Sequence, residues 1–238
     1  MKPKPKRELS LVIPAYNEEK RLAGVLQSYH DYLSKNFSAF ELIVVPNNCS
    51  DSTPKIALDF AKKHRNTKVI NIPHYVGKGG AVIRGFKAAN LPFVGFTDAD
   101  TSVTPKEFGK IFSGIEGYDC AIGSRALPES VIPVKQPMSR IFFGLGFRLL
   151  VNILFGLGIK DTQCGAKVFR AGALKKVISE LKLSRWEFDV ELLWKLKRNG
   201  AGIKEVPIAW VDDKNSKLNF RDVLDMFFGI LKLRFLYK

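Results

Sequence analysis

The stretch Leu9-Ser10-Leu11-Val12-Ile13-Pro14 is rich in branched aliphatic residues, and the segment 18–34 that follows has apolar residues at helical spacing. Together they predict a buried strand that leads into an amphipathic helix. The same alternation continues along the chain, with strands expected at 41–46, 68–72, 93–97 and 118–123 and helices at 53–64 and 79–89. Strands that alternate with helices are typical of parallel sheets. We therefore predict an α/β fold, a mostly parallel sheet flanked by helices.

The chain shows no internal repeat and no Ser-rich or Gly-rich linker, which favours one main domain. We expect a basic tail at 1–7, this domain at 8–218 and an amphipathic C-terminal helix at 219–238. The tail leads directly into the first strand without the apolar region of a secretory signal. The protein is therefore expected on the cytosolic side.

Basic residues outnumber acidic ones, with 38 Lys and Arg against 23 Asp and Glu, a formal net charge of +15. This charge predicts an anionic partner, which could be nucleic acid, anionic lipid or a phosphate-rich substrate. The hydrophobic content of 46% excludes a disordered chain. The three cysteines are far apart and form no CxxC or Cys/His cluster, so neither a zinc site nor a disulfide framework is indicated.

Two later segments are unusually apolar. The segment 141–159 approaches the length of a membrane span, but Arg148, Asn152 and several glycines interrupt it, and an Arg at the bilayer centre costs about 2.5 to 3.5 kcal/mol. It therefore fits a core helix or a stretch at the membrane interface better than a span. The C-terminal segment places large residues on one helical stripe, which suits either a core contact or lying flat on an anionic bilayer. The stripe is Phe220, Leu224, Phe227, Phe228, Leu231 and Phe235.

Two carboxylates, Asp98 and Asp100, come directly after the expected strand 93–97. Ligands of open α/β sheets bind outside the carboxyl ends of the strands, and alternation points the two side chains the same way. Such a pair is a hard oxygen-donor site for Mg2+ or Mn2+, whose remaining positions a diphosphate can fill. The alternative is a solvated loop in which the triplet arises by chance.

A glycine-rich turn, Gly77-Lys78-Gly79-Gly80, opens the helix expected at 79–89. Its backbone N–H groups can receive an anion and Lys78 adds a charge, although glycines also serve close packing. The spacing is neither that of a Walker A loop nor that of the dinucleotide fingerprint, which disfavours an ATPase and a dehydrogenase. No Ser/His/Asp constellation stands out. Metal-binding and phosphate-binding groups point to group transfer from a nucleoside diphosphate.

Eight motifs follow one another in the order and spacing of a known family. They are LVIPAYNE at 11–18, VVPNNCSD at 44–51, GKGGA at 77–81, DAD at 98–100, IGSR at 122–125, DTQCGAK at 161–167, WEFDVEL at 186–192 and SKL at 216–218. The first four resemble the inverting glycosyltransferases of family two, which have a Rossmann-like GT-A fold. The later four resemble the polyprenyl-phosphate branch, in particular the dolichyl-phosphate β-glucosyltransferases. The resemblance covers about residues 8 to 238.

The resemblance implies roles for the nucleotide end of the site. Pro14, Tyr16 and Glu18 would border the nucleobase and ribose, and Ala15 and Asn47 also belong to the expected substrate-binding residues. The resemblance also implies that Asp98 and Asp100 hold the divalent metal and the donor diphosphate, with Asp100 the stronger candidate for direct coordination, and that Ala99 between them belongs to the substrate-binding residues. The family usually has Asp-Asp-Gly-Ser where this chain has Asn47-Asn48-Cys49-Ser50. Because Asn can donate as well as accept, base recognition is open between UDP and GDP.

The resemblance also implies roles near the transferred sugar. Lys78, Arg125 and Lys217 would neutralise phosphates, which suits their chemistry. Asp161, Gln163 and Asp189 would line the sugar and acceptor region, with Asp161 and Asp189 as weaker candidates for a general base. A phosphate acceptor needs no strong base, because it is already anionic near neutral pH.

The implied reaction is transfer of a sugar, with glucose favoured, to dolichyl or another polyprenyl phosphate at the cytosolic face of a membrane. UDP-glucose is the favoured donor and GDP-mannose an alternative. Other readings keep the fold with an N-acetylglucosamine donor or a soluble saccharide acceptor, or make the chain a non-catalytic nucleotide-sugar-binding module. Nucleic acid is not an expected partner, since neither a recognition helix nor an RRM aromatic motif is present.

Overall fold

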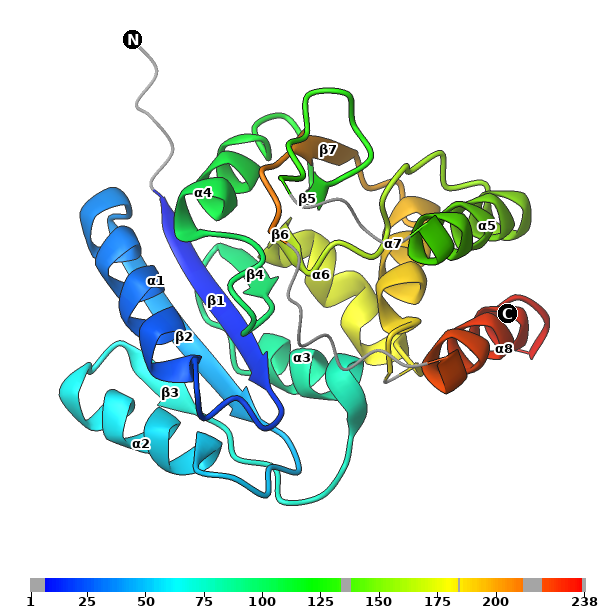
Figure 1. Cartoon of the computed structure of the whole chain (residues 1–238). Helices are drawn as coiled ribbons and strands as arrows, with labels where there is room; N and C mark the ends of the chain where they lie inside the picture. Colours follow the sequence, from blue (N-terminus) through cyan, green and yellow to red (C-terminus); the bar gives the residue numbers. More distant parts are fainter. Residues whose placement is uncertain (1–6, 134–137, 184, 212–219, 237–238) are drawn as a thin grey trace, which may run out of the picture.

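The computed structural model describes residues 7–133, 138–183, 185–211 and 220–236, and in this part of the chain a seven-stranded sheet lies between helices (Figure 1). The strands are β1 (Glu8–Ala15), β2 (Ala39–Pro46), β3 (Thr67–Val69), β4 (Phe93–Thr97), β5 (Cys120–Ser124), β6 (Ala166–Arg170) and β7 (Ile203–Pro207). The helices are α1 (Leu22–Asn36), α2 (Thr53–Lys63), α3 (Gly77–Lys87), α4 (Pro105–Ser113), α5 (Met138–Phe155), α6 (Ala171–Val177), α7 (Phe188–Arg198) and α8 (Phe220–Leu236), and a 3-10 turn, η1 (Ile178–Glu180), follows α6. The predicted mostly parallel sheet flanked by helices is confirmed.

The strand order is β3-β2-β1-β4-β6-β5-β7. Each neighbouring pair is parallel except the two pairs that involve β6, which runs against both β4 and β5. This reversal has a consequence for the edge at which the parallel strands end. Ala166, the first residue of β6, pairs with Thr97, the last residue of β4. The loop that precedes β6 therefore lies beside the carboxyl end of β4.

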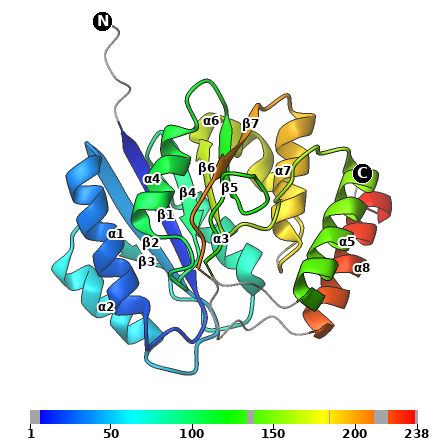
Figure 2. The ribbon, with the colours of Figure 1, turned by 45° about the horizontal axis from the view of Figure 1, so that its top comes forward.

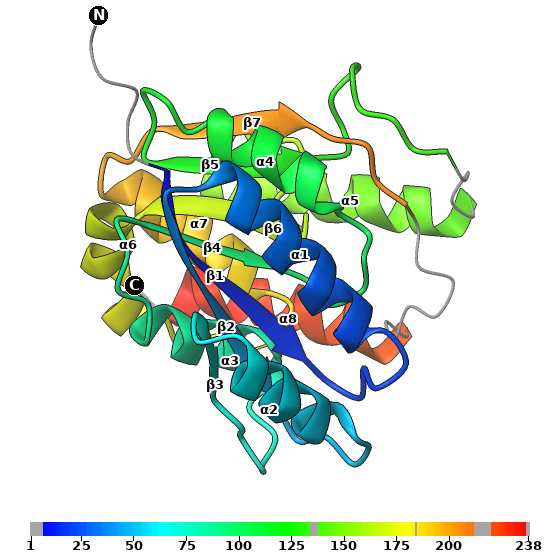
Figure 3. The ribbon, with the colours of Figure 1, turned by 90° about the vertical axis from the view of Figure 1, so that its left-hand side faces the viewer.

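Both faces of the sheet are covered, which explains why the first strand is apolar on both sides. Leu11 and Ile13 belong to the core cluster under α1, α2 and α4, whereas Val12 between them belongs to the cluster under α3, α6 and α7. Figure 3 shows the first layer from outside, with α1 and α4 crossing in front of the strands. The period-two alternation of β1 thus contributes to two cores at once.

Most predicted elements are confirmed, with shifted ends. The helix expected from residue 18 begins at Leu22, because a turn with Asn17 at φ 51° precedes it. The strands β6 and β7 were not predicted. In the sequence of β6, Lys167 and Arg170 interrupt a short apolar run, so its pattern does not suggest a central strand. Its place is decided by its pairing with β4 and β5.

The helices α5 and α8 lie side by side at the end of the molecule away from α1 and α2 (Figure 2). Arg234 of α8 donates from Nε to the carbonyl of Leu154 in α5, at 3.0 Å. In the described part of the chain, no helix is long and apolar enough to cross a membrane. The predicted boundary between a main domain ending at 218 and a helix from 219 falls outside the described residues and stays a prediction.

Candidate active site

The predicted site residues come from different elements that meet at one edge of the sheet. The parallel strands β1, β4 and β5 end there, and because β6 is reversed the loop before it arrives there as well. The helix α3 begins at this edge, since it follows the parallel strand β3. The carboxyl ends of strands are where open α/β sheets bind ligands.

Asp98 and Lys78 form an ion pair at this edge. Nζ of Lys78, the second residue of α3, is 2.7 Å from Oδ1 of Asp98 and 3.0 Å from Oδ2. The same ammonium lies 5.0 Å from the ring centre of Trp186 and 5.7 Å from that of Phe96. Burial opposes the charge of Lys78, but the carboxylates of Asp98 and Asp189 together outweigh it and raise the pKa of Lys78 above its ordinary value. The glycine-rich turn thus delivers a fixed cation beside the first carboxylate.

Asp100 is the more isolated of the two carboxylates. Its Oδ1 accepts a hydrogen bond from the backbone N–H of Ser102 at 3.0 Å. Burial and the neighbouring Asp98 carboxylate raise the pKa of Asp100 above its ordinary value. A nearby cation would stabilise the ionised form of this carboxylate, because its charge offsets both the burial and the repulsion from Asp98.

The donor set fits a divalent cation of the Mg2+ or Mn2+ kind. Asp98 and Asp100 offer only hard oxygen ligands, the type these ions prefer. Residues 7–133, 138–183, 185–211 and 220–236 contain no group of three or more His, Cys, Asp or Glu side chains that could hold a metal ion. Two carboxylates leave most coordination positions open, and a substrate diphosphate or water can fill them.

Arg125 and Asp161 form a two-pronged ion pair just beyond the end of β5. Nε and Nη2 of Arg125, which follows β5, donate to the two carboxylate oxygens of Asp161 at 2.7 and 2.9 Å. Burial by itself would raise the pKa of Asp161, yet the guanidinium holds it below its ordinary value. In the same loop, Nε2 of Gln163 is buried without a hydrogen-bond partner in the described structure. That amide is a donor available to a ligand.

A second buried cation, Lys167 of β6, was missed by the sequence interpretation. Its Nζ is 2.6 Å from Oδ1 of Asp189 near the start of α7, and both side chains are inaccessible to solvent. The ammonium also donates to the carbonyl of Cys164. Lys167 therefore ties the loop before β6 to α7. Lys167 is the last residue of the motif at 161–167, and its place in that motif was the one sign in the sequence that it belongs to the site.

The residues expected at the nucleotide lie at the ends of β1 and β2. Pro14 and Ala15 are buried, whereas Tyr16 is 44% exposed. Glu18 forms an ion pair with Arg21. Asn47 is buried and links β2 to the start of α3, because its Oδ1 accepts from the N–H of Val76 and its Nδ2 donates to the carbonyl of Gly77.

Ala99 and Lys217 complete the set of predicted site residues. Ala99 is buried between the two carboxylates of the triplet, with 4% of its surface exposed. Lys217, expected to neutralise phosphate, lies outside the described residues, so its role stays a prediction. The structure thus gathers the carboxylates, Lys78, Arg125, Gln163 and Asp189 around one edge, with the residues expected at the nucleotide beside them.

Gly165 is expected to be essential for the position of Asp98. A Cβ at Gly165 would lie 1.8 Å from Oδ2 of Asp98 and 2.5 Å from its Cγ. Gly165→Ala should therefore displace the Asp98 carboxylate and lower kcat/KM about 10²-fold, the scale of a misplacement by 1 Å. Gly172→Ala in α6 is the matched control, because a Cβ there meets nothing within 4 Å. Equal activity of the two variants would show that Asp98 need not hold this position.

Comparison with known proteins identifies the family. Residues 10–178 match Glycosyl transferase family 2. A dolichyl-phosphate beta-glucosyltransferase of Mus musculus is 35% identical over 228 residues, covering 90% of this chain and 70% of the mouse protein. Another, of Trichomonas vaginalis, is 32% identical over 246 residues, covering 99% of this chain and 75% of that protein.

A solved structure supports the fold. Glucosyl-3-phosphoglycerate synthase from Mycobacterium tuberculosis, in complex with Mn2+, UDP and phosphoglyceric acid, gives a TM-score of 0.72 at 20% identity, covering 96% of this chain and 78% of that one. This likeness confirms the GT-A fold that the motifs implied. With the family match over residues 10–178 and relatives above 30% identity along nearly the whole chain, the chain belongs to glycosyl transferase family 2 and is a glycosyltransferase.

Proposed function

We propose that this enzyme transfers glucose from UDP-glucose to dolichyl phosphate or another polyprenyl phosphate, with inversion at the anomeric carbon, at the cytosolic face of a membrane. The observation that carries the proposal is the pairing of two carboxylates, Asp98 and Asp100, with the fixed cations Lys78 and Arg125 at one edge of the sheet. Relatives named dolichyl-phosphate beta-glucosyltransferase support the choice of sugar and acceptor.

The metal in this proposal is Mg2+ or Mn2+, held by Asp100 with Asp98 beside it. When bound, the ion supplies positive charge that stabilises the departing nucleoside diphosphate. The complex of the Mycobacterium tuberculosis synthase with Mn2+ and UDP supports a divalent ion. Lys78 adds its charge next to Asp98, and Arg125 adds a second one across the site. These fixed charges lie in a partly buried edge, where they act more strongly than in water.

The proposed chemistry is a direct displacement. An oxygen of the lipid phosphate forms a bond to the anomeric carbon from the face opposite the leaving group. The bond from that carbon to the diphosphate oxygen breaks, and the nucleoside diphosphate departs with the electron pair. A phosphomonoester has its second pKa at about 6, so the acceptor needs no base to remove a proton. Asp161 and Asp189 then line the sugar and acceptor region, each held in position by an ion pair.

The test is a transfer assay with pure protein, polyprenyl phosphate in detergent and Mn2+, run separately with labelled UDP-glucose, GDP-mannose and UDP-N-acetylglucosamine. We expect label in the organic phase with UDP-glucose. Label in the organic phase only with another donor would replace the sugar, and label only in a water-soluble product would replace the acceptor. Stabilisation against heat by a nucleotide sugar, with transfer from none, would indicate a non-catalytic binding module.

A further inference from the structure

The outer surface of α5 and α8 is apolar. Six large hydrophobic side chains on these two helices are exposed to solvent, with exposed fractions between 41% and 71%. They are Leu145, Leu149 and Ile153 of α5 and Phe227, Phe228 and Phe235 of α8. The three residues of α5 are spaced four apart, so they form one stripe along the helix. We call these six residues the α5–α8 face.

The opposite sides of the same helices are packed against the protein. Val151 of α5 and Ile230 of α8 are buried in the core cluster that covers α3, α6 and α7. Leu150 and Leu154 pack against the same cluster. Each helix therefore packs one apolar side against the core and exposes a second apolar side to solvent. A helix on a water-exposed surface normally has a polar outer side.

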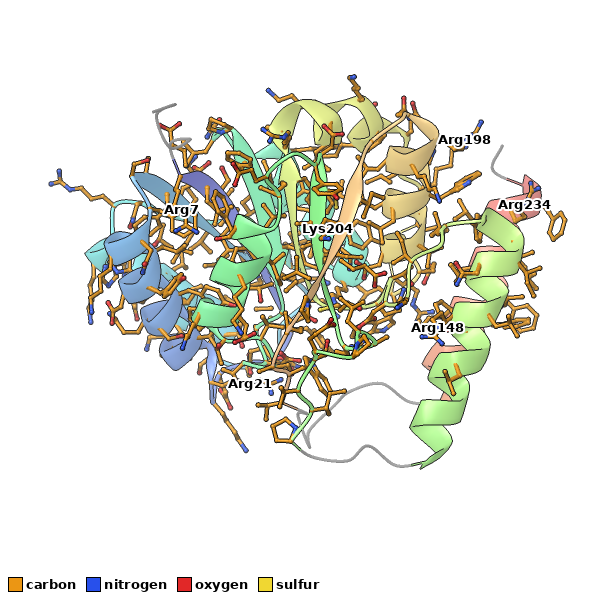
Figure 4. All side chains as sticks on the ribbon, turned by 90° about the horizontal axis from the view of Figure 1, so that it is seen from above. Arg7, Arg21, Arg148, Arg198, Lys204 and Arg234 are labelled. Atoms are coloured by element: carbon orange, nitrogen blue, oxygen red, sulfur yellow. The ribbon has the colours of Figure 1, made fainter. Side chains whose placement is uncertain are left out.

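The charges of α5 and of the second half of α8 are basic. Figure 4 shows α5 and α8 next to each other, with Arg148 on α5 and Arg234 near the end of α8. Lys232 and Arg234 are exposed and Arg148 is half-buried. The sequence of α5 contains no acidic residue, and neither does α8 after Asp225. Large apolar side chains next to Lys and Arg are typical of a helix that lies in the interface of an anionic bilayer.

A second copy of the chain fits this face less well. In a symmetric dimer the same patch of both subunits meets, so the basic residues of α5 and α8 would approach their own copies. The acidic residues of these helices, Asp222 and Asp225, lie in the first turns of α8, and Asp225 already pairs with Arg185, so they offer little compensation to the basic residues of a second copy. Anionic lipid headgroups complement the same charges.

Three consecutive residues connect α8 to the active-site edge. Arg185 donates from Nη1 to Oδ2 of Asp225 in α8 at 2.6 Å. Glu187 packs on α8 so closely that a Cβ at Gly229 would lie 2.8 Å from its Cγ. Trp186, between them in sequence, lies over the ammonium of Lys78 at 5.0 Å. The α5–α8 face is thus joined through one short segment to the residue that pairs with Asp98.

We propose that the α5–α8 face is a docking surface for an anionic lipid bilayer, with α5 and α8 lying in the headgroup region. The proposal deepens the proposed function and rests on it for one point only, the lipid nature of the acceptor. A protein docked in this way keeps the chain of a polyprenyl phosphate in the bilayer, and the segment Arg185–Glu187 places α8 next to the edge that must receive its phosphate.

The test measures binding to vesicles by flotation, with phosphatidylcholine alone and with phosphatidylserine added. We expect the unsubstituted protein to float with the anionic vesicles. Leu149→Glu/Phe228→Glu should weaken this partition by at least about tenfold, because two large side chains can no longer enter the interface. Leu58→Glu is the matched control: Leu58 is also exposed, at 47%, but lies on α2 at the other end of the molecule (Figure 1).

Two further readouts separate the outcomes. Transfer to a long polyprenyl phosphate in vesicles should fall with Leu149→Glu/Phe228→Glu, while transfer to a short, water-soluble prenyl phosphate should not. If the unsubstituted protein floats but transfers sugar to neither acceptor, the proposed function fails and the docking surface stands. Equal flotation of the variant and Leu58→Glu overturns the docking surface. The docking surface is also overturned if light scattering shows that the unsubstituted protein is a dimer and that Leu149→Glu/Phe228→Glu is a monomer that still floats with the vesicles. Ile153→Gln/Phe235→Gln, a milder pair, repeats the test should the first variant fail to fold.

Discussion

Asp100→Asn should lower sugar transfer by about 10² to 10³-fold, the scale seen when one charge-stabilising group is removed from an active site. The amide keeps an oxygen that can accept from the N–H of Ser102, so the local turn is retained. What disappears is the charge that would hold the divalent ion. The variant should therefore also lose the thermal stabilisation that Mn2+ with UDP gives the unsubstituted protein.

Stability separates this effect from misfolding. The pKa of Asp100 is raised in the folded protein, so its ionised form destabilises the folded state at pH values above that pKa. Asn removes this contribution, and we expect the free energy of unfolding of the metal-free variant to be unchanged or higher at pH 7. Asp59→Asn on the exposed surface of α2 serves as the control and should keep full activity. Full activity of Asp100→Asn would refute the metal assignment.

Lys167→Met should cause the largest loss of stability. The substitution removes the charged partner of Asp189, which is 1% exposed. Breaking a buried ion pair from one side costs about 3 to 5 kcal/mol, because the remaining charge is left without compensation. The free energy of unfolding, measured by denaturant titration, should fall by that amount. Lys62→Met, which removes a partner of the exposed Asp59, should change it by less than about 1 kcal/mol.

A double variant tests the cause. In Lys167→Met/Asp189→Leu neither charge remains buried, and most of the lost stability should return, as for other buried pairs replaced by apolar residues. Activity should not return, because the double variant no longer ties the loop of Cys164 to α7 by a charged contact. If Lys167→Met is as mild as Lys62→Met, the buried pair has no structural importance.

The strands and helices of the first half of the chain were predictable because their signals are local. The strand at 93–97 has the predicted bounds, and β1 has apolar residues on both of its faces, as predicted for a buried strand. The two carboxylates after β4 and the glycine turn before α3 were found for the same reason. β6 was not predicted, because burial of a lysine in a central strand runs against the ordinary preference of that residue.

The roles proposed for Arg125, Asp161 and Gln163 came from the family resemblance and not from the residues alone. Arg125 and Asp161 are 36 positions apart, and no periodicity connects them. Their contact exists because β5 and the reversed β6 bring the end of one strand to the loop before the other. The same holds for Lys167 and Asp189, whose partnership depends on how α7 packs.

By itself, the sequence determined the mostly parallel sheet, the two carboxylates at a strand end, the cation at a glycine turn and the basic character of the chain. The charge depends on composition, and the other features depend on the order of neighbouring residues. Only the tertiary structure decided that β6 is reversed, that Lys78 pairs with Asp98 and Lys167 with Asp189, and that α5 and α8 keep an apolar side outward. Each of these depends on contacts between distant segments, whose geometry arises when the two cores pack on the sheet.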